Sequence, residues 1–551
     1  GDEGRLKLAL GRFEKSWREA LRRLERERAV ERVWSGDALL WKNDPAHQRT
    51  IGNALGWLTI ADRMAAVMPQ LERMAERFHA GTDRVLVLGM GGSSLAPLVF
   101  ASSFGQRPGY PRLEVLDSTH PESVLAAAES APPERSIYVV SSKSGTTLEP
   151  NLFFDWFFAR AEKDLGARAG KRFVVITDPG TPLEKLARSR GVEATVLSDP
   201  AIGGRYSALS PFGIVPAVLA GIDVAELLRR ARATAAACRT GDPEQNPGAS
   251  LGAAIGALAL EGPDKLTFSV SSPIDRFGMW LEQLIAESTG KEGRGVLPVE
   301  GESLGAPDAY GDDRFFVRIG VGPEGSDPAG KLARLEASGQ PAARIEISDV
   351  LDLGAEMFRW EFATAIAGSL LGIDPFDQPN VQEAKDRTNE ILAGKDTGEA
   401  APGGGTKPRA LADLLESIRP GDYFAITAYL PSTADNEERL SRIRLPVRDG
   451  KRVATAVGFG PRFLHSTGQL HKGGPDTGAF LQITAAPSVV LPIPGRPFGF
   501  ERVIAAQAAG DLAALRSRGR RALSVDVGDP RTGLDSLAAE ASNAVGRRTM
   551  T

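Results

Sequence analysis

A run of hydroxyl side chains around one glycine is the stretch of this sequence best suited to chemistry. Between residues 142 and 147 the chain reads Ser-Lys-Ser-Gly-Thr-Thr. Hydroxyls at this density suit a phosphate group, whose oxygens each accept several hydrogen bonds. The alternative is an ordinary serine-rich connection that caps a helix. The candidate phosphate-binding side chains are Ser142, Ser144, Thr146 and Thr147.

Two charged residues beside glycines are further candidates. Arg205 follows Gly203-Gly204, and an arginine in such a turn can reach an anion or a developing oxyanion. It could equally be a surface arginine. Glu287 lies near the end of an amphipathic segment that stops at Gly290, where a carboxylate can face a cleft or simply be solvated.

The elements around these residues predict a parallel sheet. The hydroxyl run follows a buried apolar strand at 136–142 and precedes an apolar helix, whose N-terminus favours an anion. Further short apolar strands at 85–88, 113–117, 173–177 and 193–197 alternate with helix-length segments. This alternation indicates a doubly wound α/β domain. Ligands bind such domains at the carboxyl ends of strands, where both 89–94 and 142–147 would lie.

The glycine-rich stretch 89–94 is not a dinucleotide fingerprint. Gly-Met-Gly-Gly-Ser-Ser lacks the third glycine at the required offset, and no phosphate-binding GxxxxGK[ST] motif occurs there. Asp117 ends the next strand, which leaves nucleotide binding as a minor alternative. Two Ser/Gly loops at one sheet edge fit a sugar phosphate better.

A second series of strands and helices follows the first. Strands are predicted at 266–270, 314–319 and 343–347, helices at 277–288 and 357–371, and tail strands at 423–430, 480–484 and 523–527. Near the start of the chain, leucines at 6, 8, 10, 21 and 24 recur at helical spacing and predict helices. Much later, Ala401-Pro-Gly-Gly-Gly predicts a flexible linker. We therefore expect a helical segment 1–75, a phosphate-binding domain 76–240, a second domain 249–400 and a C-terminal segment 401–551.

Composition narrows the classes of function. The net charge of −4 over 551 residues argues against nucleic acid as the main partner. The sequence contains no run of 18 or more apolar residues, so we expect no membrane-spanning helix. The single Cys238 excludes an internal disulfide and suits a reducing cytoplasm. Five histidines lack metal-ligand spacing, so a metal is not expected. The first residues, Gly-Asp-Glu-Gly, suggest a processed chain or part of a longer one.

Five stretches together resemble the phosphoglucose isomerase family, aldose–ketose isomerases built from two sugar-isomerase domains. They occur in the family's order over about 300 residues, although each is weak alone. They are Gly89-Met-Gly-Gly-Ser-Ser, Ser142-Lys-Ser-Gly-Thr-Thr-Leu-Glu, Gly203-Gly-Arg-Tyr-Ser, Ala286-Glu-Ser-Thr-Gly-Lys-Glu-Gly and Pro375-Phe-Asp-Gln-Pro-Asn-Val-Gln-Glu-Ala-Lys.

The resemblance implies a fold, a reaction and a set of roles. It implies two doubly wound, three-layer domains, with N-terminal helices and an extra C-terminal α/β segment here, and metal-free interconversion of glucose 6-phosphate and fructose 6-phosphate. It also implies that no cofactor is required. Arg205 would stabilise an enediolate, Glu287 would move a proton between C2 and C1, and Lys385 would assist ring opening. The residues expected to hold the substrate are Gly92, Ser93, Ser142, Lys143, Ser144, Thr146, Thr147, Glu149 and Gln378.

The sequence departs from the family pattern at its ring-opening histidine. Family members carry this residue between the glutamate and the lysine, but here no histidine lies between Glu287 and Lys385. A similar segment, Leu464-His-Ser-Thr-Gly-Gln, comes later, and it predicts His465 as the ring opener with His471 as the second choice. Such a tail is similar to the isomerase half of a fused transaldolase/phosphoglucose isomerase.

The resemblance also implies partners and leaves alternatives. In the family the histidine commonly comes from a neighbouring subunit, so we expect a homodimer or a fusion to an N-terminal transaldolase domain, in the cytoplasm. Dual activity on glucose and mannose 6-phosphates is one alternative. A non-catalytic sugar-phosphate sensor is another, but it would have no use for Glu287, Arg205 and Lys385 together.

Overall fold

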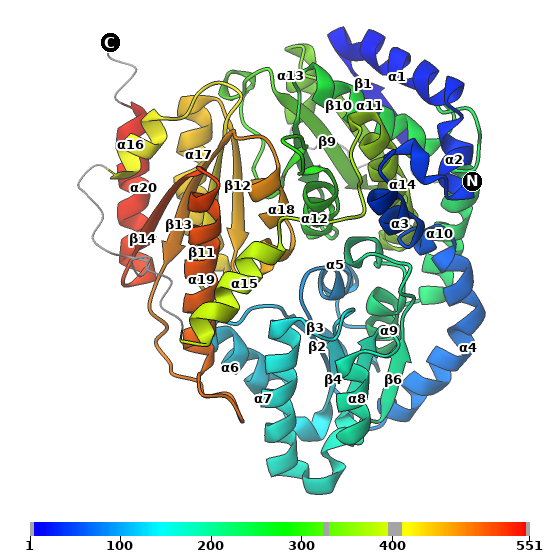
Figure 1. Cartoon of the computed structure of the whole chain (residues 1–551), viewed down its shortest axis with the longest axis vertical. Coiled ribbons are helices and arrows are strands. Elements are labelled where there is room, and N and C mark those ends of the chain that lie inside the picture. Colours follow the sequence, from blue (N-terminus) through cyan, green and yellow to red (C-terminus); the bar gives the residue numbers. More distant parts are fainter. Residues whose placement is uncertain (1–4, 323–329, 395–409, 547–551) are drawn as a thin grey trace.

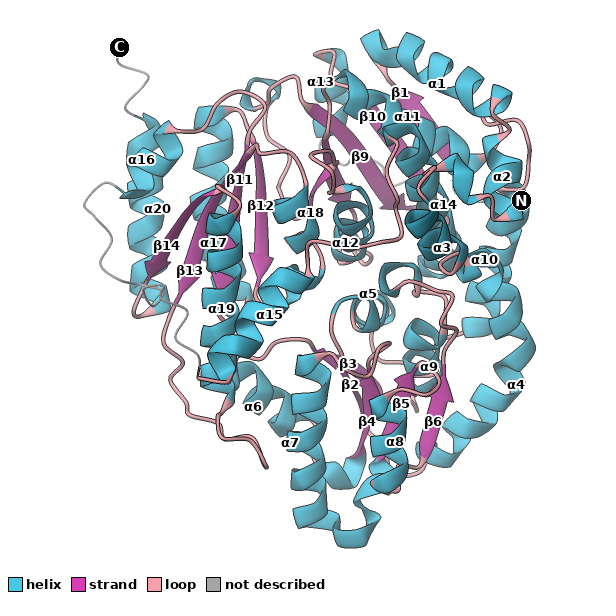
Figure 2. Cartoon of the chain, viewed as in Figure 1, coloured by secondary structure: helices cyan, strands magenta, loops and turns pink. Residues whose placement is uncertain are grey.

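Three mainly parallel sheets, each flanked by helices, make up the computed structural model of the chain (Figures 1 and 2). The structure describes residues 5–322, 330–394 and 410–546. This architecture confirms the predicted α/β fold with two doubly wound domains and a further C-terminal α/β segment. No helix in these ranges is both long and apolar enough to cross a membrane.

The first sheet holds the two loops predicted to bind phosphate. Its order is β3-β2-β4-β5-β6, all parallel. β3 lies on one side of β2, and the next strand in the chain, β4, lies on its other side. The strand order therefore reverses between β2 and β4, which makes this position the topological switch point. The strands are β2 (Arg84–Leu88), β3 (Arg112–Leu116), β4 (Ser136–Ser141), β5 (Phe173–Thr177) and β6 (Ala194–Leu197).

Side chains of these strands alternate between two apolar cores. Val85 and Val87 face the large core shared with the second sheet, whereas Leu86 and Leu88 face a smaller core beneath α7. Because both faces are covered, the strands read as continuous apolar runs. The surrounding helices are α4 (Ile60–His79), α5 (Leu95–Phe104), α6 (Pro121–Ser130), α7 (Leu148–Leu165), α8 (Pro182–Ser189), α9 (Pro211–Leu219) and α10 (Val224–Ala237).

The second sheet has the order β1-β10-β9-β7-β8, with α14 buried along its whole length. Its strands are β7 (Lys265–Val270), β8 (Leu297–Val299), β9 (Arg314–Val321) and β10 (Ala342–Ile347), with β1 at the edge. Its helices are α11 (Pro247–Glu261), α12 (Phe277–Thr289), α13 (Lys331–Ala337), α14 (Leu353–Leu371) and α15 (Gln382–Leu392).

One expectation for the N-terminal segment was wrong. Leu6 and Leu8, predicted as helical, lie in strand β1 (Arg5–Ala9), which pairs antiparallel with β10. Leucines at alternate positions also fit a strand, and the open edge of β10 provides its hydrogen-bond partner. Helices begin only afterwards, at α1 (Glu14–Arg26), α2 (Ala29–Ser35) and α3 (Pro45–Gly52).

The third sheet belongs to the C-terminal segment and has the parallel order β12-β11-β13-β14. The structure adds two strands that were not predicted, β8 and β12. The predicted linker at 401–405 lies outside the described residues, and the domain boundaries remain predictions. The elements are β11 (Tyr423–Tyr429), β12 (Ala454–Phe459), β13 (Gly478–Thr484), β14 (Arg521–Asp526), α16 (Ala410–Glu416), α17 (Ala434–Lys451), α18 (Gly468–Gly473), α19 (Phe500–Ser517) and α20 (Pro530–Gly546).

Candidate active site

The hydroxyl loop joins the end of β4 to the start of α7. Gly145 has φ +65°, and a Cβ there would lie 2.8 Å from the Cβ of Thr181, so only glycine suits this turn. The Ser144 hydroxyl accepts from the backbone N–H of Thr146 at 3.2 Å. The amide of Asn151 donates to the Thr147 carbonyl at 2.8 Å, which fixes the loop against the first turn of α7.

Two predicted members of this loop point elsewhere. The Lys143 ammonium bonds the carboxylate of Asp178 and lies 3.2 Å from the Pro200 carbonyl. Burial raises the pKa of Asp178 despite this lysine. The Ser142 hydroxyl is buried and has no hydrogen-bond partner among the described residues. Neither side chain lines the cleft in front of the loop.

The glycine loop after β2 is where three segments meet. A Cβ at Gly92 would lie 2.0 Å from the Gly204 carbonyl oxygen, and one at Gly91 would lie 2.9 Å from the Cβ of His465. Ser93, in the same turn, is buried. The glycines therefore allow the first sheet to approach both the Arg205 turn and the histidine segment closely.

Arg205 is fixed on all sides of its guanidinium. It is 2% exposed and donates to the Ser288 hydroxyl at 2.8 Å and the Gln378 amide oxygen at 2.9 Å. It also donates to the backbone carbonyls of Pro375 and Asp377 at 2.7 and 2.8 Å. A cation held this firmly needs little reorganisation when charge develops beside it.

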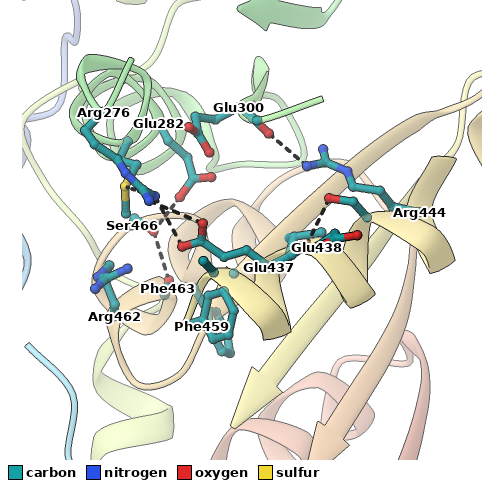
Figure 3. Close-up of a pocket in the computed structure, with 16 residues that line it drawn as sticks. Arg276, Glu282, Glu300, Glu437, Glu438, Arg444, Phe459, Arg462, Phe463 and Ser466 are labelled. Carbon is teal, nitrogen blue, oxygen red and sulfur yellow. Dashed lines mark hydrogen bonds and ion pairs between the residues drawn. The ribbon is translucent and has the colours of Figure 1, made fainter. Parts of the chain in front are cut away.

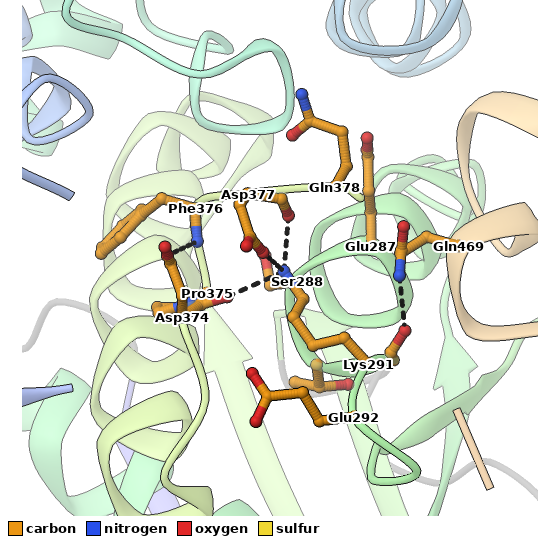
Figure 4. Close-up of polar contacts among 12 residues, drawn as sticks. Glu287, Ser288, Lys291, Glu292, Asp374, Pro375, Phe376, Asp377, Gln378 and Gln469 are labelled. Atoms are coloured by element: carbon orange, nitrogen blue, oxygen red, sulfur yellow. Dashed lines mark hydrogen bonds and ion pairs between the residues drawn. The ribbon is translucent and has the colours of Figure 1, made fainter. Parts of the chain in front are cut away.

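Glu287 lies beside this arginine, with 3.6 Å between its carboxylate and the guanidinium. Figure 4 shows Glu287 and Gln378 pointing the same way, while Lys291 turns to the backbone around Asp377. The Lys291 ammonium bonds the Asp377 carboxylate at 2.6 Å. Burial and the charge of Arg205 lower the pKa of Lys291 to about 8.

Gln283, which sequence reasoning missed, links Glu287 to the C-terminal segment. Its amide nitrogen donates to the Glu287 carboxylate at 3.1 Å and to the His465 carbonyl at 2.7 Å. Gln283 lies one turn before Glu287 on α12, so the two side chains share a face. That i, i+4 spacing was the only signal in the sequence.

His465 meets Glu149 of the first domain within one chain. The imidazole Nε2 lies 3.2 Å from the Glu149 carboxylate, which also accepts from the Gln507 amide at 2.7 Å. Gln507 in turn accepts from the Thr119 hydroxyl at 2.6 Å. Burial opposes ionisation of Glu149, but the charge and hydrogen bond of His465 bring its pKa below the ordinary value.

A cleft of about 340 Å³ gathers much of the predicted set. Lys385, on α15, is one of its lining residues. Lys472, paired with buried Asp511 at 2.6 Å, lines it without having been predicted. The predicted residues on its walls are Ser144, Thr146, Thr147, Glu149, Lys385 and His465.

His471 lies outside the cleft, in an aromatic cluster. Its ring centroid is 5.0 Å from that of Phe480, 6.1 Å from that of Tyr423 and 6.2 Å from that of Phe463. Neither ring nitrogen has a hydrogen-bond partner within the described chain. Burial lowers the pKa of His471 well below its ordinary value, so the ring is neutral.

One group within the described ranges has the spacing of metal ligands. The Nδ1 of His47 lies 3.1 Å from the Asp374 carboxylate and 3.4 Å from that of Asp377. Lys291 already bonds Asp377, so this group includes a cation of its own. It was not predicted from the sequence.

Comparison with known proteins identifies the family. The family model described as "Phosphoglucose isomerase" matches residues 59–297. A glucose-6-phosphate isomerase of Rubrobacter xylanophilus is 30% identical over 384 residues, which is 59% of this chain and 85% of the relative. The chain belongs to the phosphoglucose isomerase family. A glucose-6-phosphate isomerase of Symbiobacterium thermophilum is 29% identical over 418 residues, 66% of this chain and 92% of the relative.

Solved structures share the phosphoglucose isomerase fold of this chain. A glucose-6-phosphate isomerase from Chlamydia trachomatis has a TM-score of 0.55 and 19% identity, covering 71% of this chain and 89% of its own. A hypothetical protein from Thermus thermophilus has a TM-score of 0.59 and 24% identity, covering 71% of this chain and all of its own. At these identities the comparison concerns the fold alone.

Proposed function

We propose that this chain interconverts glucose 6-phosphate and fructose 6-phosphate, moving one proton between C2 and C1 through an enediol(ate). The observation that carries the proposal is the Glu287 carboxylate 3.6 Å from the fixed guanidinium of Arg205. Neither residue lines the cleft itself, but Gln283 links Glu287 to His465 on the cleft wall. A base next to a permanent cation is what a proton shift adjacent to a carbonyl needs.

In this proposal the hydroxyl loop holds the phosphate. Ser144, Thr146 and Thr147 donate to its oxygens, and the N-terminus of α7 adds a favourable partial charge. The phosphate lies far from the reacting carbons, so its binding energy orients the sugar. Gly92, Ser93, Ser142 and Lys143 do not line this cleft, and their roles remain predictions.

Ring opening is assigned to His465 with Lys385. Both line the same cleft, and Glu149 can stabilise the charged imidazole at 3.2 Å. Glu287 then removes the C2 proton of the open-chain aldose and returns it to C1, while the proton of the C2 hydroxyl passes to the C1 oxygen. Arg205 stabilises the oxygen that gains negative charge, since a guanidinium stays protonated throughout. In the proposal Gln378, whose amide oxygen accepts from Arg205, contacts the sugar hydroxyls.

The partners and the setting are also part of the proposal. Contact between His465 and Glu149 within one chain supports a site that needs no residue from a neighbouring subunit. A homodimer and a fused transaldolase domain remain predictions, which the mass of the native protein in solution would test. A cytoplasmic location agrees with the single cysteine, Cys238, which is buried and unpaired.

The direct test is a coupled assay on the purified chain, with a chelator present. We expect fructose 6-phosphate to be converted to glucose 6-phosphate, and the reverse, at a kcat of about 1 to 10³ per second. Mannose 6-phosphate tested in parallel would show whether the C2 epimer is also accepted. Binding of fructose 6-phosphate by a folded chain, without turnover, would contradict the proposal.

A further inference from the structure

The walls of the candidate active-site cleft carry more positive than negative charge. Glu149 is the only carboxylate among the described residues that line it, whereas Lys385 and Lys472 bring two ammonium groups. Glu149 is already engaged, because its carboxylate faces the His465 imidazole at 3.2 Å and accepts from the Gln507 amide at 2.7 Å. The cleft therefore suits an anionic ligand.

The lysine of the hydroxyl loop does not contribute to this charge. Lys143 bonds the Asp178 carboxylate and the Pro200 carbonyl, and it does not line the cleft. The loop therefore presents hydroxyl groups to the cleft without a cation of its own. A phosphate is bound more strongly where a charged donor joins the neutral ones.

The arginines near the site are committed to other groups. A second cavity, of about 310 Å³, lies between α12 and the C-terminal segment (Figure 3). There Arg276 holds the Glu437 carboxylate at 3.3 and 3.2 Å, and Arg444 donates to the Glu300 backbone carbonyl at 3.1 Å. Arg205 donates to four acceptors of the protein. None of these three guanidinium groups lines the cleft.

Lys472 can present its charge to the cleft. It is 3% exposed, and its ammonium donates to the Asp511 carboxylate at 2.6 Å, with no other hydrogen-bond partner in the described chain. Asp511 is fully buried and does not line the cleft, so it holds the ammonium from behind. An ammonium group has three N–H donors, so two remain for a ligand.

Helix α19 fixes this lysine and the candidate catalytic pair together. Gln507 and Asp511 are one turn apart on α19 and share a face, the first bonded to Glu149 and the second to Lys472. The Lys472 backbone is also held, because its carbonyl accepts from Arg520 at 3.1 Å. Burying a charge pair is costly unless further hydrogen bonds satisfy both partners. An anion in the cleft would supply the missing acceptors.

We propose that Lys472 binds the phosphate of the substrate, together with the hydroxyl loop. This inference rests on the proposed function, since it names the counter-charge for the phosphate of the same sugar phosphate. The cleft of about 340 Å³ is near the lower end of the range for small-molecule sites, so a ligand that fills it contacts most of its walls. Lys385 then remains available for ring opening. The C-terminal segment would thus supply a phosphate contact as well as His465.

Isothermal titration calorimetry of the full chain tests the proposal with two probes that cannot isomerise. One is D-glucitol 6-phosphate, which has no carbonyl group, and the other is inorganic phosphate. The variants are Asp511→Asn and the double variant Lys472→Met/Asp511→Asn. Both have a neutral residue at 511, so they differ only in the lysine and neither buries an unpaired carboxylate. We expect the double variant to bind both probes about tenfold more weakly than Asp511→Asn, or weaker still.

A matched control removes another buried lysine and the charge of its partner. Lys265 bonds Asp264 at the start of β7, outside the cleft, and Lys265→Met/Asp264→Asn should bind both probes like the wild type. A general effect on folding would appear in both double variants. The proposal is overturned if the wild-type chain binds neither probe, or if Lys472→Met/Asp511→Asn binds both as tightly as Asp511→Asn. It is also overturned if only D-glucitol 6-phosphate loses affinity, since Lys472 would then contact the sugar. Failure of the isomerase assay would leave these readings unaffected.

Discussion

Two glutamates on α12, five residues apart, have opposite surroundings. Glu287 lies 3.6 Å from the guanidinium of Arg205, next to the candidate active site. Glu282 lies beside another carboxyl, Glu300, and its pKa is raised to about 8. The same residue type is therefore paired with a cation at one position and left without a bonded cation at the other, on a single helix.

Two histidines of the C-terminal segment repeat this contrast. His465 reaches Glu149, whereas His471 lies among aromatic rings with neither nitrogen bonded in the described chain. A charged partner supports a change of protonation during a reaction, and an apolar cluster opposes it. The two pairs show that the partner, more than the residue type or the motif, decides which group can act.

The largest effect is expected from Glu287→Gln. If Glu287 is the base, kcat should fall about 10³-fold or more, because the amide cannot accept the C2 proton. Binding of sugar phosphate, measured by calorimetry, should persist. Glu282→Gln is the matched control on the same helix and should lose far less activity. Comparable losses in the two variants would contradict the assignment of Glu287.

His465→Asn should give the next largest effect, and only on ring-forming substrates. We expect a loss of about 10²-fold in kcat with glucose 6-phosphate, since acid–base assistance to ring opening is removed. 5-Deoxyfructose 6-phosphate, which cannot close a furanose ring because it lacks the C5 hydroxyl, should lose little. Rates for both substrates check this. Equal losses on the two would remove ring opening as the role of His465.

Glu282→Gln should change stability in a pH-dependent way. The folded chain keeps a proton on Glu282 up to about pH 8, whereas the unfolded chain releases it near the ordinary value of 4.5. Wild-type stability therefore falls as pH rises from 4.5 to 8, and the variant lacks this loss. We expect the variant to gain about 3.5 kcal/mol on the wild type between pH 5 and pH 8. Urea unfolding at both pH values measures it; a constant difference would mean that Glu282 is ionised.

His471→Phe should have the smallest effect near neutral pH. Phenylalanine fits the aromatic cluster and removes two unbonded nitrogens, so activity should stay within about twofold and stability within about 1 kcal/mol. Because the pKa of His471 is lowered on folding, wild-type stability decreases as pH falls below 6.5, where the unfolded imidazole takes up a proton. The variant should escape that decrease in thermal melts at pH 5. A large loss of turnover would give His471 a role in the reaction.

Much of the fold could be predicted because strands buried on both faces have a recognisable local sequence. Strands β2, β4 and β5 are covered on both faces and read as continuous apolar runs. No such apolar run is present in β12, with the sequence Ala-Thr-Ala-Val-Gly-Phe, or in the three residues of β8. Strand β1 was misassigned, since its pairing with β10 depends on an edge more than 330 residues away.

Some residues of the candidate site could likewise be predicted from local sequence, and others depend on contacts between distant parts of the chain. The loop Ser142–Thr147 is defined by its local composition, so a motif can locate it. Gln283 and Gln507 act through contacts that span 182 and 358 residues, and in the sequence they look like ordinary helix-surface amides. The sequence ranked His465 before His471 from the motif alone, but a short turn and the start of α18 decide which ring reaches the cleft.

The candidate site draws one acidic or basic group from each sheet unit: Glu149 from the first, Glu287 from the second and His465 from the third. A ligand that contacts all three groups loses its binding free energy when any one of the three sheet units opens. By mass action, sugar phosphate should then slow amide hydrogen exchange in all three sheets together, including β14 at the far edge of the third. Occupancy of the cleft would make the three sheet units unfold together as one cooperative body.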